Sequence, residues 1–247
     1  MAPFDALPVA LISQSCQTGC PMWQTATPAF RNRVAGGIAL ARELQKFADR
    51  DDVLILALPR GGVPVGYEVA RALHVPLDVY LVRKIGAPGH EELAVGALAS
   101  GGVQVLDREL IRHLGITDAD IERVATLEQA ELRRRELRYR GDRPLPTFGG
   151  RTVILVDDGL ATGSSMRAAI RAVRQQHPAH VVVAAPVGAR SACEALAREA
   201  DEVICAAMPE PFHAVGLWYE DFAQTSDEEV EALLRATAMP ARTGGAP

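Results

Sequence analysis

Five short apolar runs along the chain predict β-strands that are buried on both faces. The runs are Val53–Leu58, Leu77–Val82, Val153–Val156, Val181–Val187 and a weaker one at Val203–Ala206. An unbroken apolar run of this length is typical of a strand in a parallel sheet, because helices cover both faces of such a sheet.

Helical patterns separate most of these runs. Apolar residues recur at helical spacing from Phe30 to Phe47, and similar patterns cover Val63–Leu73, Ser164–Gln176 and Ser191–Ala200. Strands that alternate with helices of about ten residues predict βαβ units and a parallel sheet. The expected fold class is therefore α/β, with a doubly wound parallel sheet.

This alternation breaks between the second and third apolar runs. Residues 83–103 are rich in glycine and are expected to form loops, whereas Asp107–Arg140 predicts one or two long polar helices, a helical insertion. The insertion carries the basic cluster RRRELRYRGDR, which would suit a nucleic-acid surface. Glu128, Glu131 and Glu136 lie among these basic residues, however. Mixed charge favours a solvated helix face, or an arm that packs on a partner subunit.

The composition adds few constraints. Of 247 residues, 48% are hydrophobic and 23% are charged, as expected for a soluble globular protein. The net charge of −5 argues against nucleic acid as the main partner. No apolar run approaches the length of about eighteen residues that a membrane span needs, so no membrane partner is expected.

The four cysteines form no spacing pattern that predicts a disulfide framework. A reducing compartment, and hence a cytoplasmic location, is therefore expected. Cys16 and Cys20 are interpreted as free thiols, because no histidine or second cysteine pair lies near enough to complete a metal site. They belong to residues 1–28, which are expected to form an N-terminal extension to a domain at 29–247, and Met22 is an alternative start.

Residues with candidate chemistry follow three of the predicted strands. Pro59-Arg60-Gly61-Gly62 follows the first strand, Arg83-Lys84 the second, and Asp157-Asp158-Gly159 the third. In a doubly wound sheet, ligands bind at the carboxyl ends of the strands. These three segments are therefore expected to converge on one site.

The segment Val153–Ser165 predicts a phosphate-binding loop. A buried strand leads to two acids, then to a turn of small residues, and then to a helix that starts near Ser164. Backbone N–H groups and the helix dipole at such a start attract a phosphate. The small residues allow its close approach, and the hydroxyls add donors; this set comprises Ala161, Thr162, Gly163, Ser164 and Ser165.

The adjacent acids, Asp157 and Asp158, need a separate explanation. Neighbouring residues on a regular strand point to opposite faces, so the pair is expected where the strand gives way to the loop. Two close carboxylates repel each other and need hydroxyl donors or a cation to stay ionised. A ribose diol and magnesium would supply these, which predicts a ribose 5-phosphate site.

This segment resembles the signature of type I phosphoribosyltransferases, in which a hydrophobic strand, two acids and a Thr-Gly-Ser/Thr loop bind 5-phosphoribosyl-1-pyrophosphate with Mg²⁺. The chain is most similar to a group of bacterial phosphoribosyltransferase-like proteins. The resemblance implies that Arg60, Gly61 and Gly62 form a pyrophosphate loop with a strained or cis peptide near Arg60–Gly61. It also implies that Arg83 and Lys84 begin a mobile catalytic loop.

Residues 207–225 are similar to the segment, called the hood, that covers the acceptor in purine-type members of the family. By this resemblance Phe212, Val215, Trp218 and Asp221 would frame a nucleobase. A hydrophobic plug that closes the domain is the alternative interpretation of these aromatic residues.

The resemblance implies transfer of phosphoribose to a nitrogen nucleophile, a nucleobase-like acceptor, with release of pyrophosphate. Arg60, Lys84, Asp157 and Asp158 would be the catalytic residues, and a homodimer is the expected assembly. Two alternatives stay open: a sensor that binds phosphoribosyl pyrophosphate or a nucleotide without turnover, and hydrolysis of the donor by water.

Overall fold

The computed structural model describes residues 28–237. Cys16, Cys20, Met22 and almost all of the expected N-terminal extension therefore lie outside the described residues. Five strands form a parallel sheet, as the prediction of a doubly wound fold requires. Their order across the sheet is β2-β1-β6-β7-β8. The strands are β2 (Leu77–Val79), β1 (Val53–Ala57), β6 (Thr152–Val156), β7 (His180–Val187) and β8 (Glu202–Ala207).

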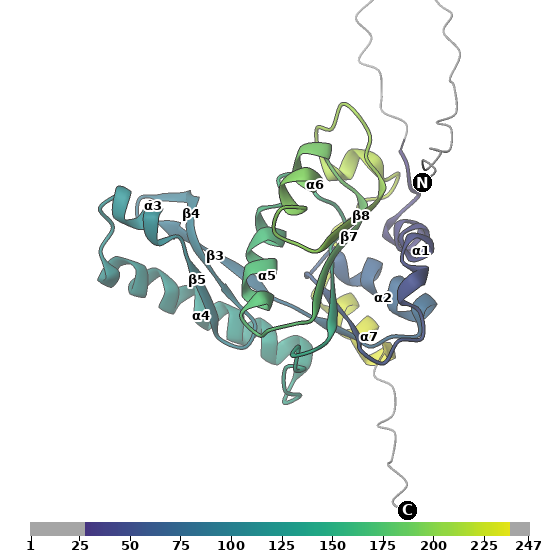
Figure 1. Cartoon of the computed structure of the whole chain (residues 1–247), viewed down its shortest axis with the longest axis horizontal. Coiled ribbons are helices and arrows are strands. Elements are labelled where there is room, and N and C mark those ends of the chain that lie inside the picture. The colour runs from purple at the N-terminus through teal and green to yellow at the C-terminus, as the bar shows by residue number, and fades with distance from the viewer. Residues whose placement is uncertain (1–27, 238–247) are drawn as a thin grey trace, which may run out of the picture.

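Helices cover both faces of this sheet (Figure 1). One layer contains α1 (Arg33–Glu43), α2 (Gly62–Leu73) and α7 (Asp227–Thr237), and the other contains α5 (Ser164–Arg174) and α6 (Arg190–Leu196). A short 3₁₀ helix, Gln45–Phe47, follows α1.

Strand β1 illustrates why the apolar runs are continuous. Val53, Ile55 and Ala57 belong to the core under α1 and α2, whereas Leu54 and Leu56 belong to the core under α5 and α6. Because alternate side chains of a strand point to opposite faces, both sets must be apolar when both faces are covered.

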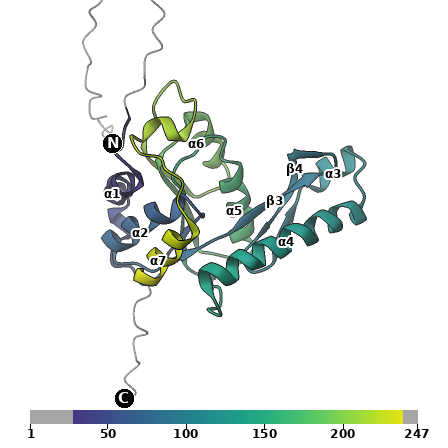
Figure 2. The same cartoon turned by 180° about the vertical axis from the view of Figure 1, so that it is seen from behind.

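The expectation of loops at residues 83–103 is wrong. Strands β3 (Val82–Ala87), β4 (His90–Ala99) and β5 (Val103–Leu106) form a three-stranded antiparallel sheet there. With helices α3 (Arg108–His113) and α4 (Asp118–Arg140), these strands make an arm that extends from the main sheet (Figures 1 and 2). The apolar run at Leu77–Val82 is accordingly shared between β2 and the start of β3.

The glycines of this segment explain the error. Gly89, Gly101 and Gly102 have positive φ angles in the two turns of the arm, as expected for loop glycines. Gly96 instead lies inside β4, where a Cβ atom would come within 2.6 Å of the Val105 carbonyl oxygen. Glycine therefore allows two strands to approach closely at that position, and composition alone does not separate this role from a turn.

Helix α4 matches the predicted polar helix. It begins with a capping box in which Thr117 and Asp120 bind each other's backbone N–H groups. Much of its basic cluster is paired within the chain: Arg134 and Arg135 contact Glu131, and Arg138 contacts three carboxylates of α7. The pairing supports a solvated, mixed-charge face. Within residues 28–237, no helix is both long enough and apolar enough to cross a bilayer.

Candidate functional site

The candidate site lies where β1 and β6 end. The turn that holds Arg60 and Gly61 connects β1 to α2, and Asp157 and Asp158 follow β6 directly. The two strands are parallel neighbours, so their carboxyl ends lie at the same edge of the sheet. The peptide bond between Pro59 and Arg60 is cis, one bond before the position that the family resemblance indicated.

Glycine is required where the two connections touch. A Cβ atom on Gly61 would lie 1.9 Å from Asp158 Oδ2, and one on Gly62 would lie 2.7 Å from the carbonyl oxygen of Val156. Heavy atoms cannot approach this closely without displacement. The Gly-Gly pair therefore brings the β1 turn against the acids that follow β6.

The two acids are held differently. Asp158 Oδ2 accepts a hydrogen bond from Arg33 Nε at 2.8 Å, and both side chains are largely buried. The backbone carbonyl of Asp158 accepts a hydrogen bond from the Tyr219 hydroxyl at 2.6 Å. Asp157 Oδ1 accepts the backbone N–H of Asp158 at 2.9 Å. Arg33 thus neutralises one carboxylate of the pair directly.

The environment disfavours two negative charges. Burial, and secondly the charge of Asp158, raises the pKa of Asp157 well above its ordinary value. Burial also raises the pKa of Asp158, although the hydrogen bond and the charge of Arg33 oppose this shift. A cation or a set of hydroxyl donors near the pair would lower both pKa values and stabilise the ionised forms.

The turn before α5 has the geometry of an anion site. Gly163 adopts a left-handed conformation (φ 70°) directly before Ser164, the first residue of the helix. Thr162 Oγ1 and Ser164 Oγ are 2.8 Å apart and share a hydrogen bond. Ala161, Thr162, Ser164 and Ser165 are exposed, so their donors are accessible to a ligand. The exposed hydroxyls and the N-terminus of α5 together can bind a phosphate.

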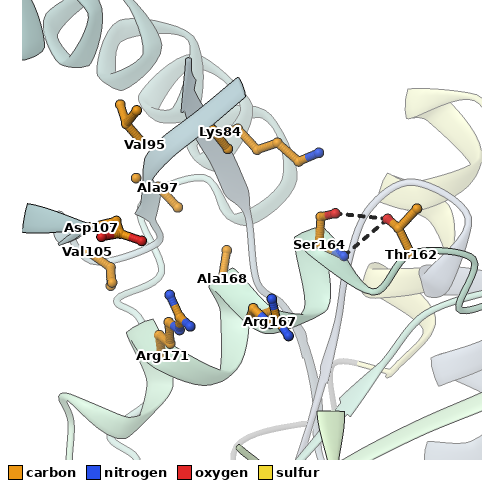
Figure 3. A pocket seen from close by; sticks show the side chains of 12 residues that line it. Lys84, Val95, Ala97, Val105, Asp107, Thr162, Ser164, Arg167, Ala168 and Arg171 are labelled. Carbon is orange, nitrogen blue, oxygen red and sulfur yellow. Dashed lines mark hydrogen bonds between the residues drawn. The ribbon is translucent and has the colours of Figure 1, made fainter. Parts of the chain in front are cut away.

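A cavity of about 270 Å³ lies beside this turn (Figure 3). Lys84 of β3 lines the cavity together with Thr162 and Ser164. Arg167 and Arg171, on successive turns of α5, line it as well, and the sequence reasoning missed them. Both guanidinium groups contact Glu199 at 2.7 and 2.8 Å, so part of their charge is already neutralised.

Arg83 and Lys84, predicted as a pair, are separated by the strand that holds them. Arg83 Nε lies 2.6 Å from Glu128 Oε2 of α4, whereas Lys84 is exposed and lines the cavity. Consecutive residues on a strand point to opposite faces, which accounts for the difference. A role for Arg83 in ligand binding stays a prediction, and it would require this ion pair to open.

Residues 29–215 match the family model of the phosphoribosyl transferase domain. The chain belongs to this family. It is 42% identical over 205 residues to the "Putative phosphoribosyl transferase Rv0571c" of Mycobacterium tuberculosis H37Rv, and the match covers 83% of the chain and 46% of that protein. A protein of the same description, MT0597 of strain CDC 1551, matches equally. The chain thus spans about half the length of the curated relatives it matches.

One solved structure is similar to most of this chain. The crystal structure of TT1426 from Thermus thermophilus aligns with a TM-score of 0.77 and 46% sequence identity. The alignment covers 85% of this chain and 99% of that chain. The similarity therefore extends well beyond the short motifs at the site.

In this member of the family, the hood-like segment packs on itself, on the segment before α1 and on the turn after β6. Trp218 is buried, and the centroid of its ring lies 6.2 Å from that of Phe212. Val215 packs closely against Gly159, because a Cβ atom on Gly159 would lie 2.4 Å from Cγ1 of Val215. The carboxylate of Asp221 accepts the backbone N–H of Ala223 at 3.0 Å. These contacts favour the hydrophobic plug. Base binding by these four residues stays a prediction.

Sequence reasoning also missed Arg33 and Tyr219. Arg33 precedes Asp158 by 125 positions and lies at the start of α1, where no motif distinguishes it from other helical arginines. Its guanidinium lies 3.9 Å from the centre of the Phe222 ring, and Phe222 stacks on Tyr219. Only the folded chain brings the hood-like segment, α1 and the acids together.

Proposed function

We propose that the chain transfers phosphoribose from magnesium-bound 5-phosphoribosyl-1-pyrophosphate to a nitrogen nucleophile and releases pyrophosphate. One observation carries the proposal. The paired acids after β6 lie against the Gly-Gly turn after β1, and the hydroxyl-rich turn before α5 follows the acids by only a few residues. Phosphoribosyl pyrophosphate requires hydrogen-bond acceptors for its ribose diol and hydrogen-bond donors for the phosphates on both sides of the ribose.

The turn Thr162–Ser165 would bind the 5-phosphate. Its hydroxyls and the backbone N–H groups at the start of α5 are donors, and an anion at a helix N-terminus is stabilised by the helix dipole. Binding energy from this remote group would orient C1 of the ribose for reaction. Ser164 and Ser165 are exposed, so a ligand can reach their hydroxyls from solvent.

The two acids fit a magnesium complex of the donor. Magnesium is commonly held by one or two carboxylates together with substrate oxygens. Within residues 28–237, no group of three or more His, Cys, Asp or Glu is placed to hold a metal, so the donor would have to complete the coordination. Asp157 or Asp158 would contact the cation or the ribose hydroxyls. Bound magnesium would supply charge neutralisation at the pyrophosphate oxygens.

Arg60 and Lys84 would bind the pyrophosphate. The Arg60 guanidinium is partly exposed, and the carboxylate of Asp227 is 3.9 Å away, so it is held only loosely. Lys84 is exposed at the cavity beside the phosphate turn. Cations that are accessible and only weakly paired can contact a leaving group and stabilise the charge that develops on it.

The reaction breaks the bond between C1 and the pyrophosphate oxygen and forms a bond between C1 and the acceptor nitrogen. The electron pair of the broken bond leaves with pyrophosphate, so positive charge develops at C1. Ionised Asp157 and Asp158 would hold the ribose hydroxyls and favour this charge. We propose a nucleobase-like acceptor and a homodimer as the assembly.

A second candidate function has one observation in its favour. The aromatic residues that would frame a base pack on one another, and Trp218 is only 7% exposed. A sensor that binds the donor, or a nucleotide, without turnover would need no acceptor site. Turnover is the better proposal, because Lys84 and Arg60 remain accessible for the leaving group.

Binding of the donor is tested directly by calorimetry with phosphoribosyl pyrophosphate, with and without magnesium. We expect the double variant Asp157→Asn, Asp158→Asn to bind at least about tenfold more weakly than the unaltered chain, with an unchanged circular dichroism spectrum. Asp142→Asn, an exposed carboxylate just beyond α4, is the matched control. Equal binding by the double variant would remove the assignment of the acids.

A further inference from the structure

Two cysteines that lie apart in the sequence meet on the side of the sheet covered by α6. Cys193 belongs to α6 and Cys205 to β8, and their sulfur atoms are 3.1 Å apart. Gly188, which follows the last residue of β7, faces both. A Cβ atom there would lie 2.7 Å from Cys193 Sγ and 2.9 Å from Cys205 Sγ. The absence of a side chain at this position leaves room for the thiol pair.

The pair is accessible from outside. An open cavity of about 410 Å³ is lined by both cysteines together with Arg190, Glu194 and Met208. Cys205 is partly exposed, while Cys193 is 7% exposed. A small solute that enters this cavity comes next to both cysteine residues.

We propose that Cys193 and Cys205 form a redox-active thiol pair that low-molecular-weight disulfides oxidise, reversibly, to an intramolecular disulfide. Sulfur atoms on two separate elements, in hydrogen-bonding contact and open to one cavity, carry this inference. In a reducing compartment such a pair is typical of redox-sensing sites rather than of structural disulfides. The proposal is independent of the transferase function.

The oxidation proceeds in two exchange steps. The thiolate of one cysteine attacks one sulfur of the small disulfide, forms a mixed disulfide and releases one small thiolate, which takes up a proton. The second cysteine then loses its proton and attacks the sulfur of the first, which releases the second small thiol. The protein loses two electrons and two protons, and one small disulfide is reduced to two thiols.

The contact between the two thiols shifts the pKa values of both cysteines. The hydrogen bond between the two thiols, and to a smaller extent the nearby charge of Arg190, lowers the pKa of Cys193, and burial opposes this shift. The same interaction, followed by burial, raises the pKa of Cys205. Because the thiolate is the attacking species, the thiol that ionises attacks the small disulfide and the other thiol resolves the mixed disulfide.

The pair adjoins the proposed phosphate site through the backbone. Leu160, which lies between Asp158 and Thr162, donates its N–H to the Val187 carbonyl at 2.9 Å and accepts the N–H of Ala189 at 2.8 Å. These bonds flank Gly188. Oxidation would therefore fix α6 to β8 beside the segment that leads into the phosphate turn.

The test uses the reduced full chain and oxidised glutathione. Cys16→Ser and Cys20→Ser remove the other two thiols, and thiol titration, intact mass and peptide mapping follow the reaction. We expect both remaining thiols to disappear, with a mass loss of two hydrogen atoms, a mapped Cys193–Cys205 link and full reversal by dithiothreitol. In the same background, Cys205→Ser and Cys193→Ser should each stop at a single glutathione adduct on the cysteine that remains.

Two results would overturn the proposal. One is a lasting glutathione adduct in the chain that retains both Cys193 and Cys205, because the second thiol would then fail to resolve it. The other is no loss of these thiols under conditions that oxidise Cys16 or Cys20 of the unaltered chain. Both readouts use a chain with an intact thiol pair, so they do not depend on whether the single variants fold.

Discussion

Arg33 donates a hydrogen bond from Nε to Asp158 Oδ2 at 2.8 Å, although 125 positions separate the two residues. Both side chains are largely buried, with exposures of 12% and 16%. Removal of one partner from such a pair leaves an uncompensated buried charge. The start of α1 is therefore part of the candidate site, although it lies in a different segment of the sequence from every recognised motif.

Replacement of Arg33 by methionine should destabilise the chain by about 3 kcal/mol, because Asp158 loses its cation. Donor binding should weaken in parallel. Urea denaturation measures the first effect and calorimetry the second. Arg42→Met, an exposed arginine in the same helix, provides the control and should change neither quantity. Unchanged stability of the Arg33 variant would show that Asp158 finds another partner.

Gly61→Ala should impair donor binding more than it impairs folding. The added methyl group would lie 1.9 Å from Asp158 Oδ2, so the carboxylate must leave its place beside Arg33. Gly149→Ala is the matched control, because the nearest atom to its Cβ would be 3.9 Å away and its backbone needs no positive φ. Binding of the donor is measured for both variants. Equal affinities would contradict the assigned role of the Gly-Gly turn.

The pH dependence of stability should change with Asp157→Asn. Burial and the charge of Asp158 raise the pKa of Asp157, so the folded chain holds this proton more tightly than the unfolded chain. Such a group stabilises the fold below its unfolded pKa of about 4, and this contribution is lost as the pH rises through the raised value.

The asparagine variant lacks this loss, so it should gain stability relative to the unaltered chain as the pH rises from about 4 toward neutrality. The gain is about 1.4 kcal/mol for each unit by which the pKa of Asp157 is raised. Urea denaturation at a series of pH values measures it, and Asp142→Asn should show no such trend. A constant difference between variant and parent across the series would mean that the pKa is not raised.

The arm depends on a second buried ion pair. Arg140, at the end of α4, contacts Asp78 Oδ2 of β2 at 3.1 Å and donates to the Val79 carbonyl at 2.8 Å. Because both residues are buried, Asp78→Ala should cost about 3–5 kcal/mol of stability. Additional replacement of Arg140 by methionine should recover part of that loss. Thermal and urea unfolding test both statements, and a double variant less stable than Asp78→Ala would refute the second.

The sequence predicted the main sheet well because its signals are local. A strand covered on both faces must be apolar throughout, and its helices follow at regular intervals, so the order of elements could be read directly. The position of Asp157 and Asp158 after β6 followed from the same rule. The antiparallel arm was missed, because Gly96 permits close strand packing while Gly89 forms a turn, and both appear identical in the sequence.

Other parts of the site depend on contacts between distant segments. No local pattern pairs Arg33 with Asp158, and none brings Cys193 to Cys205 across α6 and β8. The alternation of Arg83 and Lys84 between two faces became predictable only once β3 was known to be a strand. Motifs therefore located the acids and the turn before α5, whereas the charge that balances the acids could be found only in the folded chain.

Release of pyrophosphate from magnesium-bound phosphoribosyl pyrophosphate tests the central claim most directly. The chain is incubated with the donor alone and with a panel of purines, pyrimidines and other nitrogen nucleophiles. The account predicts release that depends on one acceptor and that falls at least about a hundredfold in the Asp157→Asn, Asp158→Asn variant. Tight donor binding without release in the presence of every acceptor would contradict the transferase and favour the sensor.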